Sequence, residues 1–148
     1  MAAFDAEPRD SVLVLGRTRT LAGQMVLEGG LGRRLRQGMV PPEPASISSA
    51  SVSGAEGGLR ASEFLRLAAV EVLEVRVSFG DLVVTVTDGS GPAVARFPTG
   101  FLAELRVESL DPGTVLDIQG LLLPAISGGT WEVRPRLPTD LIGLDPAP

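Results

Sequence analysis

Residues 82–97 read Leu-Val-Val-Thr-Val-Thr-Asp-Gly-Ser-Gly-Pro-Ala-Val-Ala-Arg-Phe and predict two strands joined by a tight turn. In the first strand, alternate positions differ in character: Leu82, Val84 and Val86 are apolar, and Val83, Thr85 and Thr87 are more polar as a set. Alternation with a period of two is typical of a strand that buries one face. Residues 88–92, Asp-Gly-Ser-Gly-Pro, are a strong turn signal, after which residues 93–97 return as the second strand.

Strand patterns continue on both sides of this hairpin. Before it, residues 69–79 carry valines whose parity switches near Leu73 and Glu74, which predicts a long strand with a β-bulge at that point. After it, residues 98–110 form a longer connection whose apolar spacing suits a short helix or a packed loop. A fourth strand then ends at Gly120, and a fifth covers residues 130–136.

Five strands with a longer connection between the third and the fourth resemble the OB-fold family. The motifs that carry the resemblance are Val-Thr-Val-Thr-Asp-Gly-Ser-Gly at 84–91 and Asp-Pro-Gly-Thr-Val-Leu-Asp-Ile-Gln-Gly at 111–120. Over residues 69–143 the chain looks most similar to the OB-like modules found in tandem in bacterial surface proteins and secreted nucleases. The resemblance implies a barrel that binds single-stranded nucleic acid; an immunoglobulin-like or other small sandwich is the alternative architecture.

The first third of the chain resembles part of the same unit. Residues 7–16 align without a gap to residues 111–120, so that residues 8–28 correspond to the last two strands of an OB-like unit; the alternative is an unrelated hairpin. A lone hairpin is only marginally stable in water and has unpaired edges. We therefore expect it to pack on its own barrel or to pair with another chain.

The predicted fold class is all-β, a five-stranded OB-like barrel preceded by a β-hairpin arm, with one or two short helices. The predicted segments are an arm with a Pro-rich linker at 1–45, a Ser/Gly-rich linker at 46–58, the barrel at 59–143 and a tail at 144–148. Residues 59–67 are expected to form a short helix with Phe64 and Leu65 inward.

Composition excludes several chemistries. The chain has no His, no Cys and no Tyr, and all 13 basic residues are Arg. Ser-His-Asp and Cys-His triads, Cys or His zinc sites, disulfides and Schiff-base lysines are therefore ruled out. The turn at 88–91 superficially resembles a calcium loop, but position 86 is Val and the pattern favours a plain turn. We expect no catalysis, no cofactor, no metal and no small-molecule substrate.

Charge is unevenly distributed along the chain. Residues 9–36 carry a net charge of +4, whereas residues 37–148 carry −7, within a total of −5. A basic N-terminal segment on an otherwise acidic chain attracts polyanions or the acidic part of a neighbouring copy. The candidate nucleic-acid contacts are Arg17, Arg19, Arg33, Arg34, Arg36 and Arg96. Nucleic acid is the disfavoured partner, because all six aromatic residues are assigned to core or packing positions and a stacking platform is missing.

The favoured prediction is a structural or accessory module that assembles with a protein partner, with single-stranded nucleic-acid binding as the alternative. The residues expected to bind the partner lie on the arm and in an apolar loop after the fourth strand: Val12, Val14, Met25, Leu27, Arg33, Arg34, Arg36, Leu122, Leu123 and Ile126. No apolar run is long enough to span a membrane, and residues 1–10 lack the features of a signal peptide. The location is therefore cytoplasmic by default, whereas the resemblance implies an extracellular or periplasmic one.

Overall fold

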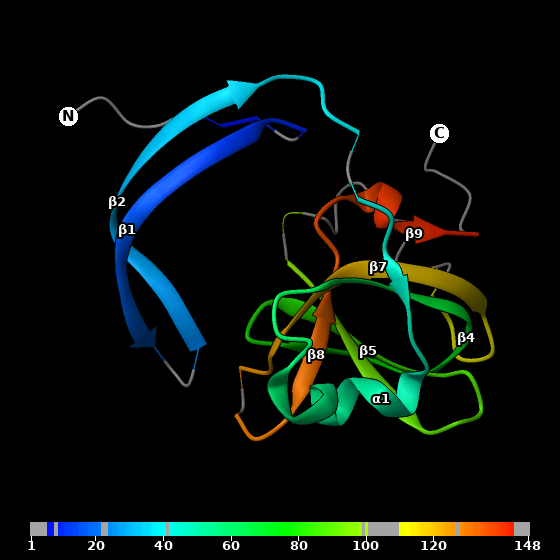
Figure 1. The fold of residues 1–148 in the computed structure, drawn as a ribbon. Helices are drawn as coiled ribbons and strands as arrows, with labels where there is room; N and C mark the ends of the chain where they lie inside the picture. The colour runs from blue at the N-terminus through cyan, green and yellow to red at the C-terminus, as the bar shows by residue number, and fades with distance from the viewer. Residues whose placement is uncertain are drawn as a thin grey trace. The chain divides into compact units, whose positions relative to one another are not determined.

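The computed structural model describes residues 6–7, 9–21, 24–40, 42–98, 100, 110–126 and 128–143. The chain divides into two compact units, residues 1–43 and residues 44–148, which we call the arm and the body. Figure 1 shows the arm as a long curved ribbon and the body as a set of strands with short helical segments. Among the described residues, no helix is long and apolar enough to cross a membrane.

The arm is an antiparallel hairpin of β1 (Ser11–Leu21) and β2 (Gln24–Arg36), which confirms the predicted hairpin and extends it beyond residue 28. The pairing register shifts between Leu15 and Arg17, where β2 inserts one extra residue. Gly29 lies in this bulge with φ of +65°, a conformation that glycine adopts without a steric cost. At its open end, the hairpin is closed by a backbone hydrogen bond of 2.8 Å from the Met39 N–H to the Arg9 carbonyl oxygen.

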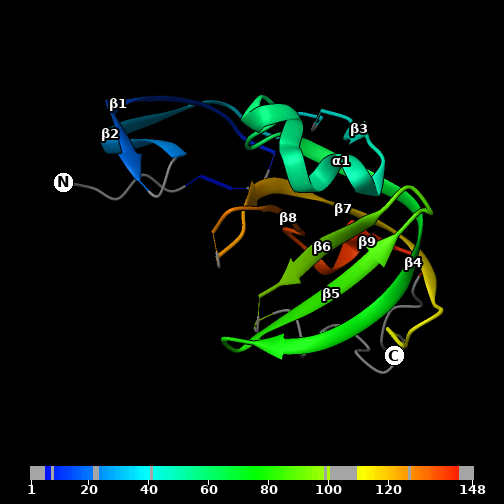
Figure 2. The same cartoon turned by 90° about the horizontal axis from the view of Figure 1, so that it is seen from below.

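The body is built on five strands: β4 (Phe64–Ser78), β5 (Asp81–Thr87), β6 (Pro92–Phe97), β7 (Val115–Pro124) and β8 (Trp131–Arg134). Their order is β4-β5-β6-β8-β7, and β7 also pairs with β4, so the sheet closes into a ring. Figure 2 shows β4, β5 and β6 side by side. The predicted all-β class and the five-stranded barrel are confirmed.

The ring encloses one hydrophobic core. Its most completely buried side chains come from every strand of the ring and include Leu65, Val84, Phe97, Ile118, Leu122 and Val133. The predicted bulge in β4 is confirmed, since the β4–β5 register shifts between Val72 and Glu74. Because of that extra residue, Val72 and Val75 both face the core in spite of their opposite parity.

The predicted helix at 59–67 is wrong. Leu59 is 87% exposed, and the chain from Phe64 onward belongs to β4, where Leu65 and Leu67 alternate into the core. The helical residues lie instead in the segment expected to be a flexible linker, which forms β3 (Ala45–Ser46), α1 (Ser49–Gly54) and the 3-10 helix η1 (Ala55–Gly58). This segment is ordered because Val52 and Ala55 are completely buried in the core.

The strand β7 does not end at Gly120 as predicted. It continues to Pro124, and a Cβ atom at position 120 would lie 2.6 Å from the carbonyl carbon of Arg134. Glycine is therefore required where β7 approaches the chain leaving β8. After β8, the 3-10 helix η4 (Pro138–Asp140) leads into β9 (Leu141–Ile142), which pairs with β7. Most of the predicted connection at 98–110, and the tail at 144–148, lie outside the described residues.

Candidate functional site

Four of the predicted partner-binding residues share one face of the arm. In the β1–β2 register, Val12 pairs with Arg34, Val14 with Gly32, Thr18 with Leu27 and Thr20 with Met25. Cross-strand partners and alternate residues of a strand project to the same side. We call this side the valine face: Val12, Val14, Met25 and Leu27, with exposed fractions between 38% and 77%.

The opposite side of the arm, the leucine face, carries Leu13, Leu15, Leu31, Arg17 and Arg33. The three leucines are between 47% and 63% exposed. At the bulge this face has an open hollow of about 550 Å³, with Leu15, Leu31 and Arg17 among its lining residues. These leucines are absent from the predicted binding residues, although the run Val-Leu-Val-Leu at 12–15 indicates a strand that is apolar on both faces.

The predicted cluster of arginines on β2 is not a single patch. Arg33 pairs with Leu13 and Arg34 with Val12, so the two guanidinium groups leave the ribbon on opposite sides. Arg34 forms an ion pair of 2.7 Å with the buried carboxylate of Asp10, and Arg36 lies at the end of β2 opposite Ser11. Because consecutive strand residues alternate between faces, Arg33 and Arg34 do not lie on one surface.

The two arginines of β1 lie on the leucine face. Arg17 is exposed and pairs across the strands with Glu28. Arg19 forms an ion pair of 2.9 Å with the same Glu28, and both of those side chains are 60% exposed. This pair contributes little to stability, since exposed ion pairs are worth about 1 kcal/mol or less.

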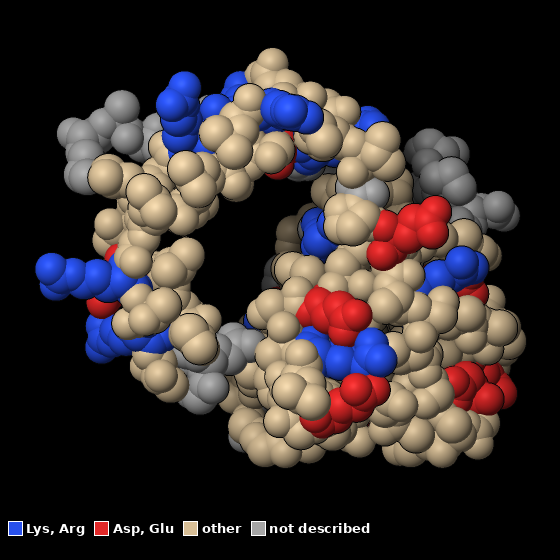
Figure 3. Space-filling view, viewed as in Figure 1, with Lys and Arg blue, Asp and Glu red and all other residues tan. Residues whose placement is uncertain are grey.

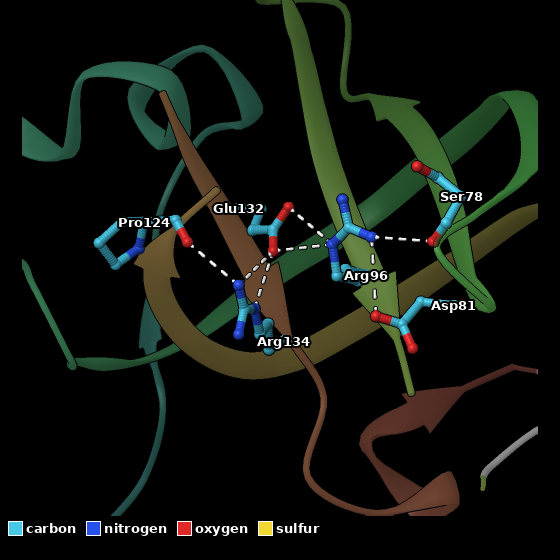
Figure 4. A network of polar contacts seen from close by, with 6 residues as sticks. All are labelled: Ser78, Asp81, Arg96, Pro124, Glu132 and Arg134. Atoms are coloured by element: carbon cyan, nitrogen blue, oxygen red, sulfur yellow. Dashed lines mark hydrogen bonds and ion pairs between the residues drawn. The ribbon is translucent and has the colours of Figure 1, made fainter. Parts of the chain in front are cut away.

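In the body, Arg96 projects from the outer face of β6 as predicted, but it is covered and is not exposed for nucleic acid. Its side chain is 8% exposed, and its Nε lies 2.9 and 3.0 Å from the two carboxylate oxygens of Glu132. Asp81 lies 3.7 Å from Arg96, and Arg134 donates to Glu132 over 2.8 Å. Figure 4 shows this network between β6, β8 and the start of β5. Since two carboxylates face two guanidinium groups, the network is balanced in charge.

The register places this network on the outer surface of the ring. Arg76 pairs with Val83, and Val83 pairs with Arg96, so these three residues form a row across β4, β5 and β6. Val83 is completely buried although it lies outside the core cluster. Arg76 is exposed, and the Arg134 side chain is 30% exposed.

One aromatic residue departs from the predicted packing. Phe79 follows β4 in a tight turn, has φ of +55° and is 86% exposed. The sequence held the signal, because the predicted turn Phe79-Gly80-Asp81 places the ring at its apex, where little protein surrounds it. The assignment of all aromatic residues to packing positions is therefore wrong for Phe79.

The predicted apolar loop after the fourth strand is largely a strand. Leu122 is completely buried in the core and is not available to a partner. Leu123 is half-buried and pairs with Glu132 of β8. Ile126, in the connection between β7 and β8, is 52% exposed and is the one residue of the three that a partner can reach fully.

The turn at 88–91 is held by α1 rather than by a ligand. The Ser49 hydroxyl lies 2.6 Å from a carboxylate oxygen of Asp88, and the Ser49 and Ser90 backbone N–H groups donate to the same carboxylate over 3.0 and 2.9 Å. The Ser49 hydroxyl, followed by the Ser90 hydroxyl, holds the pKa of Asp88 well below its usual range. Within the described part of the chain, no group of three or more acidic side chains is arranged to hold a metal ion.

No protein-family model matches this chain, and no curated protein matches it. Among solved structures, the fold is similar to that of asparaginyl-tRNA synthetase from Pyrococcus horikoshii complexed with asparaginyl-adenylate, with a TM-score of 0.53 and 15% sequence identity. The match covers 68% of this chain and 22% of the synthetase chain. At this identity the similarity concerns the fold alone.

The body has an OB-like fold. In OB-folds, oligonucleotides and oligosaccharides bind on the face of the second and third strands and on the loops that flank it. In this body those strands are β5 and β6, and the flanking connections are the Phe79 turn and the segment between β7 and β8 that contains Ile126. The Arg96–Glu132 network lies on the outer face of β6 and β8, and Phe79 lies in one of the flanking connections.

Proposed function

We propose that this chain is a non-catalytic assembly module that binds a protein partner through its arm. The observation that carries the proposal is the exposure of large apolar side chains on both faces of the arm. No large apolar side chain described in β1 and β2 is buried, and seven of them are between 41% and 77% exposed.

The energetics of a two-stranded ribbon support this function. An isolated hairpin is marginally stable in water, and contiguous exposed apolar surface is typical of interaction sites. Each fully buried Leu or Val contributes about 1.5–3 kcal/mol relative to exposure. A partner that covers Leu13, Leu15 and Leu31 therefore stabilises the arm and the complex together.

The polar groups of the body support a structural role. Its most deeply buried carboxylate, Glu132, is engaged by two arginines. A buried pair of this kind fixes strand positions, here those of β6 and β8. Asp88 is likewise engaged by hydroxyl and backbone donors that connect α1 to the turn at 88–91.

The proposal is tested by site-specific photocrosslinking. A benzophenone side chain is placed at Leu31 on the leucine face, or at Leu59, which is 87% exposed in the body, as the matched control. In the cells that produce the chain, light is expected to join position 31 to protein, with far less product from position 59. Equal crosslinking at the two positions would contradict an arm-directed interface.

A second candidate function is the binding of single-stranded nucleic acid on the β5–β6 surface, and the exposed ring of Phe79 favours it. A base that stacks on an aromatic ring contributes roughly 1–3 kcal/mol. The nearby cations are Arg76 and Arg134, and the protein with the similar fold is, by its name, a tRNA synthetase.

This candidate is tested by titrating a fluorescent 12-nucleotide oligo-dT at low and high salt. Binding is expected to weaken as salt rises, and Phe79→Ala is expected to weaken it roughly tenfold, within the range for one lost stack. Leu59→Ala serves as the exposed control. Binding that is equal for Phe79→Ala and the parent chain would exclude the Phe79 ring from the site.

A further inference from the structure

We infer that the partner of the arm is a second copy of this chain, whose body binds the leucine face through an acidic strip made of Glu71, Leu73, Glu74 and Val115. The inference rests on the proposed function, because it names the occupant of the same arm surface.

The acidic strip lies on the outer face of β4 beside the start of β7. Glu71 pairs with Val115, and the residues that flank Glu71 along β4, Val70 and Val72, are buried. Glu71 and Val115 therefore both point away from the core. The bulge adds Leu73 and Glu74 to the same side, so that two acids and two apolar residues are presented together.

The exposure of the strip fits a docking surface. Leu73 is 45% exposed and Val115 is 58% exposed, and both glutamates are exposed. Within the described part of the chain, neither glutamate forms an ion pair. The strip thus combines apolar area with negative charge that no arginine of the described residues neutralises.

The leucine face has the complementary composition. Leu13, Leu15 and Leu31 supply apolar area, and Arg17 and Arg33 lie among them on the same side of the ribbon. Both arginines are exposed, and neither forms an ion pair with another described residue. Leucines flanked by guanidinium groups on the arm therefore match apolar residues flanked by carboxylates on the body.

The difference in net charge favours the body of a second copy, rather than its arm, as the surface that binds the leucine face. Residues 11–36 contain five arginines and one glutamate, a net charge of +4, whereas residues 44–148 carry −6. Figure 3 shows mainly arginine among the charged side chains of the arm, and both acidic and arginine side chains on the visible face of the body. Two arms repel each other, while an arm attracts a body, and complementary charge also steers their encounter.

An arm-to-body contact is heterologous, since the two surfaces differ. Each copy then has one arm that binds a neighbour and one acidic strip that accepts the arm of another neighbour. Successive copies therefore form a ring or an open chain. We therefore expect the mass in solution to rise with concentration beyond that of a dimer.

The experiment is charge exchange in the full chain, read out by light scattering after size exclusion over a hundredfold concentration range. One variant carries Arg17→Glu with Arg33→Glu, a second carries Glu71→Arg with Glu74→Arg, and a third combines all four substitutions. Each double variant is expected to raise the concentration for half-assembly roughly a hundredfold, because like charges then face each other. The combined variant, whose net charge equals that of the parent, is expected to restore assembly.

A matched control distinguishes the effect of the acidic strip on assembly from the effect of net charge alone. Glu56→Arg with Glu63→Arg changes the net charge of the body by the same amount as the strip variant, and both residues lie beside Arg60 instead of in the strip. This control is expected to assemble at least as readily as the parent chain. The fluorescence of Trp131, the only tryptophan, verifies that every body is folded. Glu71→Gln with Glu74→Gln replaces the strip variant if that variant unfolds.

Four outcomes overturn the inference. The first three are a parent chain that stays monomeric at every concentration, a strip variant that assembles as the parent does, and a combined variant that fails to regain assembly. An arm variant that assembles more readily than the parent also contradicts it, because reduced repulsion favours contact between two arms. Crosslinking at Leu31 to another protein, together with any of these results, leaves the proposed function standing while the contact between the leucine face and the acidic strip of a second copy is excluded.

Discussion

The arm and the body are built from the same strand-forming residues, yet their surroundings differ sharply. In the body, Leu65, Leu67 and Leu122 are completely buried, while Leu15 and Leu31 of the arm are 63% and 61% exposed. The arm has two strands of 11 and 13 residues, longer than most strands of the body. Long strands rich in leucine and valine are therefore not sufficient to bury their side chains.

The two units differ because the strands of the body close into a ring, whereas the strands of the arm do not. In the body, each ring strand has a neighbour on both sides, and α1 contributes Val52 to the same core. In the arm, each strand has one neighbour and both outer edges are unpaired within the described residues. A closed ring shields its inner face and removes its edges, whereas a ribbon leaves both faces and both edges for another molecule.

The largest expected effect comes from breaking the closure of the body. Gly120→Ala places a Cβ atom 2.6 and 2.7 Å from the carbonyl carbon and oxygen of Arg134. Backbone atoms cannot rotate aside as a flexible side chain does, so the substitution is expected to cost upward of about 3 kcal/mol. Urea unfolding followed by Trp131 fluorescence measures this loss.

The matched control for this prediction is Gly54→Ala. No heavy atom lies within 4 Å of the corresponding Cβ position, and the backbone φ of −96° suits alanine. Its urea midpoint is expected to stay within experimental error of the parent. If Gly120→Ala unfolds at the same urea concentration as Gly54→Ala, the close approach of β7 to Arg134 is wrong.

Truncation of one leucine in each unit is expected to have a smaller effect and compares the two units directly. Leu122→Ala removes a completely buried side chain and is expected to destabilise the body by about 3 kcal/mol. Leu15→Ala removes a side chain that is 63% exposed and is expected to leave the body unchanged while weakening association. The pair is measured by urea unfolding and by light scattering. A loss of body stability in Leu15→Ala would show that the arm contributes to the core.

Much of the fold follows from periodicity in the sequence. The hairpin at 82–97 and the bulge near Leu73 were predicted because alternating apolar residues report which face is inward at each position. The hairpin of β1 and β2 was predicted from the alignment of residues 7–16 with residues 111–120. These features depend on contacts between segments that are adjacent in the sequence, so the pattern of residues within those segments is enough to predict them.

The errors arise where distant residues decide the structure. The helix α1 lies in a Ser/Ala/Gly stretch that reads as a linker, and Ser49 is held by Asp88, 39 residues away. Gly120 reads as the end of a strand, although it is the point at which β7 passes the chain after β8. Arg96 reads as an exposed cation because its partner Glu132 is 36 residues away.

The smallest effect expected is a pH dependence of the stability of the body. Hydrogen bonds from the Ser49 hydroxyl and then Ser90 lower the pKa of Asp88, and the Ala69 N–H and then Arg66 lower the pKa of Asp117. A lowered pKa in the folded state means that the stabilisation is present above the unfolded pKa of about 3.9. It is lost as the pH falls from there through the folded pKa, so the urea midpoint is expected to decline on acidification below about pH 5.

Substitution of Ser49 tests the origin of this dependence. Ser49→Ala removes the largest cause of the Asp88 shift and is expected to cost about 1 kcal/mol at neutral pH and less at low pH. The control is Ser53→Ala, whose exposed hydroxyl makes a single hydrogen bond of 3.3 Å to the Ala50 carbonyl oxygen. If the difference between the Ser49 variant and the parent stays constant from neutral pH down to pH 3, the Ser49 hydroxyl does not stabilise the ionised form of Asp88. The contribution of α1 would then come from the burial of Val52 and from the backbone hydrogen bonds of Ser49 and Ala50 to the turn at 88–91.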